Sequence, residues 1–218
     1  MTDIVLFGAG GLAREVLLTL DAINERIPGI GYNVRGFVVN EQYYQQGMIV
    51  GGYPVLGTEE WMFENKDNVY CVCAIGFPKP RADIQAALTL MGVRFISIVH
   101  PSVRIPESTS IGKGCVIQGG TTISADCVIG DGVFINTYCT VGHDAYIGDY
   151  TCIMPATGVS GNVKIGREVM IGGHAYIVPG RNIGDKATIA AGSVVFTNVK
   201  AGIKVLGNPA HRMECLEL

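Results

Sequence analysis

Between residues 99 and 195, isoleucine or valine occupies every sixth position without exception. This period differs from the 3.6-residue repeat of a helix and from the two-residue alternation of a strand. Glycine often follows the aliphatic residue, as in Ile111-Gly112 and Ile147-Gly148. The pattern is the hexapeptide repeat of a parallel β-helix, in which three hexads form one triangular coil. Residues eighteen apart are therefore expected to stack in neighbouring coils, about 4.8 Å apart.

Residues 1–98 have a different pattern, in which short apolar runs alternate with amphipathic segments. Leu12, Val16, Leu20 and Ile23 recur at helical spacing and predict one buried helix face. Strands that alternate with helices indicate a small parallel sheet, here a truncated Rossmann-like α/β unit. The predicted strands are 3–8, 35–40, 69–75 and 93–98, the predicted helices are 12–26, 58–64 and 80–91, and 41–52 is a predicted loop.

The change of pattern at His100-Pro101 predicts the domain organisation. We expect an α/β domain over residues 1–98 and a β-helix over residues 99–199. After Val195 the six-residue period breaks, so residues 200–218 are expected to form a short C-terminal tail.

Composition and charge exclude some classes of function. The chain has 218 residues and a formal net charge of -3, which argues against a broad basic surface for nucleic acid. No apolar run approaches the ~18 residues that span a bilayer, and the N-terminus reads directly into a strand without a secretory leader. We therefore expect a cytoplasmic protein without membrane insertion.

The seven cysteines do not form a metal-binding pattern. Cys115, Cys127 and Cys139 are twelve residues apart, two-thirds of a coil, so they face three different sides of the predicted prism. No CxxC pair is present. Free thiols and no metal site are therefore expected.

The segment Gly8–Ala13 reads GAGGLA between a predicted strand and helix. It fits G-x-G-x-x-G/A, in which backbone amides at a helix start approach a phosphate. A tight turn without a ligand explains the segment equally well. A dinucleotide site also needs an acidic residue at the end of the second strand, where this chain has Asn40. A nicotinamide-dependent enzyme is therefore disfavoured.

A second candidate is the pair His143-Asp144, next to a predicted corner. Gly161 is eighteen residues further on, so the repeat stacks it against His143. A histidine can accept a proton from an attacking amine or hydroxyl, and a glycine amide can donate to a carbonyl oxygen that gains charge. Asp144 can orient the imidazole. The alternative is a surface histidine at a variable hexad position.

Taken together in order, six motifs resemble the NeuD/PglD-type sugar O- and N-acyltransferases of the hexapeptide-repeat superfamily. The resemblance covers essentially the whole chain. It implies a nucleotide-sugar-binding α/β domain followed by a left-handed parallel β-helix that binds acetyl-CoA. The motifs are FGAGGLAREV at the start, AIGFPKPR at Ala74–Arg81, HPSV at His100–Val103, VGHDAYIGDY at Val141–Tyr150, SGNVKIG at Ser160–Gly166 and GNPAHRM near the end.

The resemblance also implies roles for individual residues. His143 matches the general base, Asp144 its acidic helper, and Gly161 the glycine whose amide meets the thioester carbonyl. Four positions match contacts to the nucleotide sugar, and two match main-chain contacts to acetyl-CoA. The sugar positions are Gly10, Gly11, Asn40 and Gly76, and the acetyl-CoA positions are Gly173 and Ala191.

At two further positions this chain differs from many relatives. Leu12 stands where relatives have a histidine near the acceptor, and Cys152 stands where some have a histidine near the thioester. We assign Leu12 to the sugar site and Cys152 to the acetyl-CoA site on this basis.

The resulting prediction is an acetyl-CoA-dependent acetyltransferase that acts on an amino group of a nucleotide-linked amino-deoxysugar. Transfer is direct, with a histidine general base and no metal. The alternatives are O-acetylation of sialic acid or another surface-polysaccharide sugar, and a non-catalytic β-helix assembly protein. The resemblance further implies a homotrimer with active sites between subunits.

Overall fold

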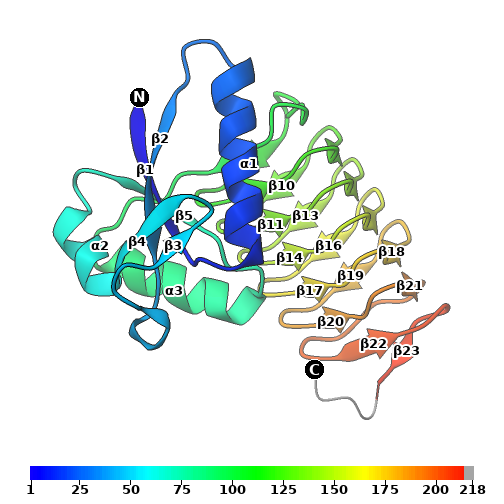
Figure 1. Ribbon diagram of the computed structural model, residues 1–218. Helices are drawn as coiled ribbons and strands as arrows, with labels where there is room; N and C mark the ends of the chain where they lie inside the picture. Colours follow the sequence, from blue (N-terminus) through cyan, green and yellow to red (C-terminus); the bar gives the residue numbers. More distant parts are fainter. Residues whose placement is uncertain (214–218) are drawn as a thin grey trace.

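The structure is a computed structural model and describes residues 1–213 (Figure 1). An α/β unit stands beside a long parallel β-helix, with α1 upright between them. The sheet of the α/β unit has the order β3-β4-β2-β1-β5. Its elements are β1 (Thr2–Phe7), α1 (Gly11–Arg26), β2 (Tyr32–Val38), a 3-10 turn (Glu41–Tyr43), β3 (Ile49–Val50), β4 (Tyr53–Gly57), α2 (Glu59–Asn65), β5 (Tyr70–Cys73) and α3 (Pro78–Leu90).

Burial follows the pattern predicted for the α/β unit. β1 lies between β2 and β5 and pairs in parallel with both, and its residues Ile4–Phe7 are buried on both faces. On α1 the predicted apolar face is buried through Val16, Leu20 and Ile23. These side chains pack on the sheet, which fixes where α1 begins relative to the end of β1.

Two segments differ from the sequence prediction. Residues 41–52, predicted as a loop, contain the 3-10 turn and β3, which pairs with β4 in an antiparallel hairpin. β4 itself was hidden by Pro54 and Gly57, which lower strand propensity, yet it pairs with β2. The strand predicted at 93–98 is reduced to a bridge between Cys71 and Phe95 and the short β6 (Ile98–Val99).

The β-helix consists of two- or three-residue strands that form three sheets, or faces. The first face holds β6, β8 (Val116–Ile117), β11 (Phe134–Ile135), β14 (Cys152–Ile153), β17 (Met170–Ile171), β20 (Thr188–Ile189) and β22 (Lys204–Leu206), with β23 (His211–Arg212) added antiparallel. The second face holds β9 (Thr122–Ile123), β12 (Thr140–Val141), β15 (Gly158–Val159), β18 (Tyr176–Ile177) and β21 (Val194–Val195). The third face holds β7 (Ser110–Ile111), β10 (Val128–Ile129), β13 (Tyr146–Ile147), β16 (Lys164–Ile165) and β19 (Asn182–Ile183).

Strand pairing confirms the eighteen-residue coil. Val128 pairs with Tyr146, and Thr140 pairs with Gly158, in register and in parallel. The chain visits the three faces in turn, so the corners form three edges. The first edge joins the first and second faces, the second edge joins the second and third faces, and the third edge joins the third and first faces.

The aliphatic ladder forms the core of the β-helix. Ile117, Ile135, Ile153, Ile171 and Ile189 stack along the inside of the first face and are each fully buried. Burying each side chain contributes roughly 1.5–3 kcal/mol. The glycine after the aliphatic residue also has a steric cause, because a Cβ at Gly142 would collide with the amide nitrogen of Gly161 in the next coil.

The α/β unit covers the first face. Val116, Phe134 and Cys152 point outward from that face, yet they are buried in one cluster with Val72 and Ala74 of the α/β unit. A buried hydrogen bond of 2.6 Å from the Thr19 hydroxyl of α1 to the Gln118 side-chain oxygen adds a polar link. Of the three faces, the first is therefore occupied by the chain itself.

The predicted C-terminal tail continues the first face before it turns away. Thr188 of β20 pairs with Lys204 of β22, sixteen residues on, and β23 then folds back antiparallel. Cys215 lies outside the described residues. Within residues 1–213, none of the helices has both the length and the hydropathy needed to cross a membrane.

Candidate active site

The carboxyl ends of β1, β2 and β5 meet at one edge of the small sheet. β1 leads to β2 on one side and to β5 on the other, so this edge is the topological switch point where α/β sheets bind ligands. The predicted sugar residues all follow the carboxyl ends of these strands, at the end of the sheet that we call the crevice. They are Gly10, Gly11, Leu12, Asn40 and Gly76, and a Cβ at Gly76 would lie 3.7 Å from the Leu12 side chain.

The glycine loop leaves the start of α1 open. Gly10 is the N-cap of α1 and supplies no side-chain cap, and both Gly10 and Gly11 are exposed. A Cβ at either position would meet nothing within 4 Å. Free amides at the positive end of a sixteen-residue helix suit a phosphate group.

Asn40 at the end of β2 has an acidic partner that sequence reasoning missed. Its side-chain amide donates a hydrogen bond to the Glu59 carboxylate in the first turn of α2. A carboxylate therefore does stand at this corner of the crevice, although it comes from another element. The signal in the sequence is Thr58-Glu59-Glu60, an acidic helix start directly after β4.

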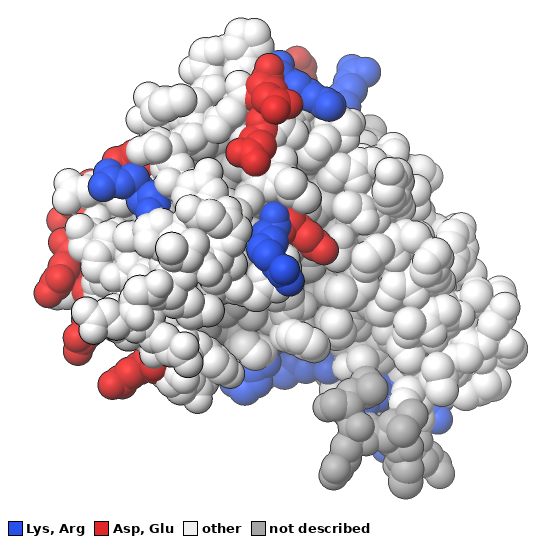
Figure 2. Space-filling view, in the orientation of Figure 1, with Lys and Arg blue, Asp and Glu red and all other residues white. Residues whose placement is uncertain are grey.

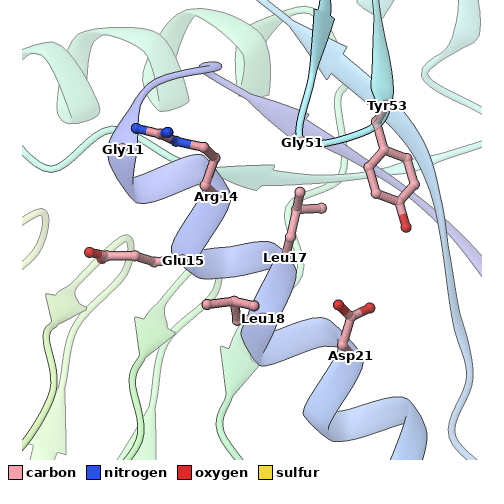
Figure 3. A pocket seen from close by; sticks show the side chains of 8 residues that line it. All are labelled: Gly11, Arg14, Glu15, Leu17, Leu18, Asp21, Gly51 and Tyr53. Atoms are coloured by element: carbon pink, nitrogen blue, oxygen red, sulfur yellow. The ribbon is translucent and has the colours of Figure 1, made fainter.

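A pocket of about 490 Å³ runs along α1 from the glycine loop (Figure 3). It lies between α1 and the β3–β4 hairpin, with the side chains of Leu17 and Tyr53 on its walls. Gly11 is the one predicted sugar residue that lines this pocket, so the pocket adjoins the glycine loop.

His143 and Asp144 lie at the second edge, between β12 and β13. His143 Nδ1 and Asp144 Oδ2 are 2.7 Å apart, and both side chains are more than half exposed. A carboxylate only accepts hydrogen bonds, so Nδ1 carries a proton, and in the neutral imidazole Nε2 is left free to accept one. Asp144 adopts φ 58°, a left-handed conformation that aspartate tolerates better than most residues.

Gly161 lies against the imidazole, as the repeat predicts. A Cβ at Gly161 would stand 2.6 Å from His143 Nε2, so only glycine fits without moving the histidine. Its N–H has no acceptor among the hydrogen bonds of residues 1–213. On the third edge, by contrast, the corresponding N–H of Asp131 is capped by the Asp149 carboxylate eighteen residues on. Gly161 therefore offers a free donor next to a free base.

Gly173 and Ala191 stack at the first edge. The Gly192 N–H donates to the Gly173 carbonyl at 2.9 Å, which joins the two coils, and Ala191 is exposed. This edge lies across the second face from His143, as expected from the repeat.

The structure does not support Cys152 as a contact to acetyl-CoA. Its side chain is fully buried on the first face, beneath the α/β unit, and does not lie on the edge of His143. Desolvation raises the pKa of its thiol to about 12. The repeat predicts that Cys152 lies on a strand, but the sequence does not indicate which face of the β-helix the α/β unit covers.

Within one chain the crevice and His143 do not meet. Gly76 in the crevice faces Phe134 on the first face, whereas His143 lies at the second edge, opposite that face. Among the described residues, no three His, Cys, Asp or Glu side chains gather as metal ligands. The site is thus two half-sites, an anion crevice and a base with a free amide.

A hexapeptide-repeat prism with a histidine-carboxylate pair at one edge defines a transferase of the β-helical class. Family comparisons agree: residues 126–161 match the bacterial transferase hexapeptide family, and residues 102–137 and 162–197 match the hexapeptide repeat of succinyl-transferase. Residues 3–88 match the PglD N-terminal domain. An α/β domain of the PglD type followed by transferase hexapeptide repeats is the arrangement of the NeuD/PglD-type sugar acetyltransferases, to which this chain is similar, and its β-helix is accordingly left-handed.

Solved structures support this family over nearly the full length. PerB from Caulobacter crescentus, solved with CoA and GDP-perosamine, is 27% identical with a TM-score of 0.87, and the match covers 98% of each chain. The acetyltransferase domain of PglB from Neisseria gonorrhoeae is 29% identical with a TM-score of 0.87, covering 98% of this chain and 100% of that domain. WeeI from Acinetobacter baumannii is 27% identical with a TM-score of 0.84, covering 98% and 100%. Among curated proteins, no sequence match reaches significance.

Proposed function

We propose that this chain transfers the acetyl group of acetyl-CoA to the amino group of a nucleotide-linked amino-deoxysugar. The anion crevice at the start of α1 suits the diphosphate of such an acceptor. Among the structural relatives, the Caulobacter protein is a perosamine N-acetyltransferase that binds CoA and GDP-perosamine. That relative favours nitrogen over oxygen as the acetylated atom.

The observation that carries the proposal is the contact between His143 and Gly161. Nε2 of His143 removes a proton as the sugar amine attacks the thioester carbon. The free N–H of Gly161 donates to the carbonyl oxygen as it gains negative charge. The new amide bond forms, the C–S bond breaks, and the departing CoA sulfur takes the proton from His143. Asp144 holds the imidazole in the required tautomer throughout.

The second half of the proposal is a homotrimer with sites between subunits. The crevice and His143 are on opposite sides of one prism, so a neighbouring copy must bring them together. The second face suits such packing, because its outward residues carry no charge: Thr122, Thr140, Gly158, Tyr176 and Val194. In Figure 2 charged side chains gather mainly over the α/β unit, and much of the β-helix surface in view is uncharged. Gly173 and Ala191 on the first edge of the neighbour then border the acetyl-CoA.

The decisive experiment measures release of free CoA thiol with acetyl-CoA and a panel of acceptors. The panel holds GDP- and UDP-linked amino sugars, including GDP-perosamine, together with sialic acids for the O-acetylation alternative. His143→Ala is expected to lower turnover by about 10²- to 10⁴-fold, the usual contribution of a general base. His211→Ala, an exposed histidine on β23, is the matched control and should leave turnover unchanged. Turnover retained by His143→Ala would refute the mechanism, and absence of acetyl-CoA binding would favour the assembly-protein alternative.

A further inference from the structure

The guanidinium of Arg81 is completely buried, although it is charged. Its hydrogen bonds all go to backbone carbonyls. Nη1 donates to Cys73 at 2.8 Å and to Ile75 at 2.9 Å, Nη2 donates to Gly114 at 3.0 Å, and Nε donates to Gly132. No carboxylate pairs with Arg81 among the described residues. The Phe134 ring lies 5.9 Å from the guanidinium carbon and adds a cation–π contact. A buried charge without a carboxylate partner is costly, so its placement calls for an explanation.

The carbonyls belong to two different parts of the molecule. Cys73 ends β5, and Ile75 lies in the loop that carries Gly76 to the start of α3. Gly114 and Gly132 are corners of two successive coils on the third edge of the β-helix. α3 itself reaches from beneath the sheet toward the β-helix (Figure 1). One side chain thus ties the crevice loop to the prism.

The third edge is shaped to receive this arginine. Gly114 and Gly132 have positive φ of 67° and 63°, a conformation that favours glycine. A Cβ at Gly114 would meet the Gln85 side-chain oxygen at 2.7 Å, and one at Gly132 would meet the Tyr150 ring at 2.5 Å and the same Gln85 oxygen at 2.9 Å. Gln85 is itself buried and lies one turn after Arg81 on α3. The two glycines therefore leave room for the side chains of α3 that donate hydrogen bonds to these corners.

We infer that Arg81 is a positioning residue for acetyl transfer. It fixes the position of the crevice loop Ala74–Phe77 along the axis of the β-helix. This rests on the proposed function, in which a sugar in the crevice must meet a histidine fixed on a neighbouring prism. His143 has a fixed position on the neighbouring prism, and the packing of the prisms fixes where it lies. The sugar reaches it only if the crevice loop keeps a constant position relative to its own prism. Misplacement by about 1 Å can cost a factor of 10² in rate.

Lysine cannot replace this arginine. The guanidinium is planar and presents five N–H donors in fixed directions, which reach carbonyls on two sides at once. An ammonium keeps the charge but reaches fewer of the four acceptors. Arg81→Lys therefore removes hydrogen bonds between the loop and the prism while it keeps the buried positive charge. It changes the protein less than Arg81→Met, which removes the charge and all of these hydrogen bonds.

The test compares Arg81→Lys with Thr19→Val, which removes a different buried hydrogen bond between the α/β unit and the β-helix. Hydrogen exchange of the peptide covering 74–77 is measured on the free full-length protein. Arg81→Lys is expected to raise exchange there by about tenfold or more, with α1 unchanged, whereas Thr19→Val leaves residues 74–77 protected. Thermal unfolding of both variants verifies that each is folded.

Kinetics with acetyl-CoA and GDP-perosamine as probe acceptor give the second readout. Arg81→Lys is expected to lower kcat by about tenfold or more and to raise the acceptor KM, with the acetyl-CoA KM unchanged. Equal exchange and equal kinetics in the two variants would reduce Arg81 to a structural link and overturn the inference. Absence of acetyl transfer by the wild-type protein would refute the proposed function instead, while the exchange result still decides the role of Arg81 in holding the loop.

Discussion

At the scale of single residues, the site depends on the absence of a side chain at position 161. A glycine there leaves space for the imidazole and leaves its own N–H without an acceptor. Eighteen residues further on stands Pro179, whose side chain offers no acceptor to cap that N–H. The third edge has aspartates in the same position, which close the equivalent amides. On the second edge the equivalent amides of Ala125 and His143 are also without an acceptor among the described residues, so the imidazole beside it is what distinguishes the Gly161 donor.

Gly161→Ala tests this arrangement. The added methyl group would meet His143 Nε2 at 2.6 Å, so the imidazole must rotate off its line to the acceptor. We expect kcat to fall by about 10²-fold, the scale of losing one preorganised group, with only a small loss of thermal stability. Pro179→Ala, one coil further along the same edge, should leave kcat unchanged. Steady-state kinetics that show equal kcat for both variants would contradict the contact.

The contact of His143 with Gly161 was open to sequence reasoning because a strict period converts position into geometry. Arg81 and Glu59 were not. The four acceptors of Arg81 come from segments up to 51 residues away, and all are backbone carbonyls, which leave no trace in the sequence. Only the spacing of Gly114 and Gly132, one coil apart, hints that a buried group enters that edge.

At the scale of the element, the corners of the coil repeat one hydrogen bond wherever the fifth hexad position holds threonine or cysteine. The side chain at the fifth position donates to a carbonyl fifteen residues on, as Thr151 does to Gly166 at 2.8 Å. Cys115, Cys127 and Cys139 occupy the same position and do the same through sulfur, at 3.1, 3.2 and 3.2 Å. The cysteines thus replace threonine in a structural role, and their scattered directions agree with the absence of a shared site.

This role predicts unreactive thiols. Desolvation raises the pKa of Cys115 and of Cys139 to about 11, so thiolate is scarce near neutral pH. In a Cys215→Ser variant, which removes the cysteine outside the described residues, we expect the folded protein to react with a thiol reagent at pH 8 at least about 100-fold more slowly than after unfolding. Absorbance of the released chromophore follows both rates. Rapid titration of even one thiol in the folded protein would contradict the buried corners.

Helices and strands were easier to predict from the sequence than the pairing and packing between them. The apolar pattern gave α1, β1 and the coils, whose burial depends on their own side chains. The β3–β4 hairpin has little buried surface of its own and is held because β4 pairs with β2, which leaves β3 at the edge of the sheet. Likewise, Cys152 is buried only because the α/β unit lies over its strand. Such features depend on the tertiary arrangement and carry little local signal.

At the scale of the whole molecule, the faces and edges of the prism differ in what covers them and in their charge. The first face is occupied by the α/β unit, and the third edge carries charged side chains such as Asp131, Asp149, Arg167 and Asp185. The second face is uncharged and lies between the edge of His143 and the edge of Gly173. A closed ring of three copies that buries this face would place those two edges, from different subunits, on either side of one cleft.

Mixing two inactive variants tests whether the site is shared between copies. His143→Ala removes the base but leaves the crevice, and Gly10→Phe fills the crevice from an exposed position where a Cβ meets nothing within 4 Å. If the crevice of one subunit works with His143 of the next, random mixed trimers have about one quarter of their sites intact. We therefore expect co-expression at equal levels to restore about one quarter of wild-type turnover. A site built within one chain would restore none, because every chain in the mixture lacks one half.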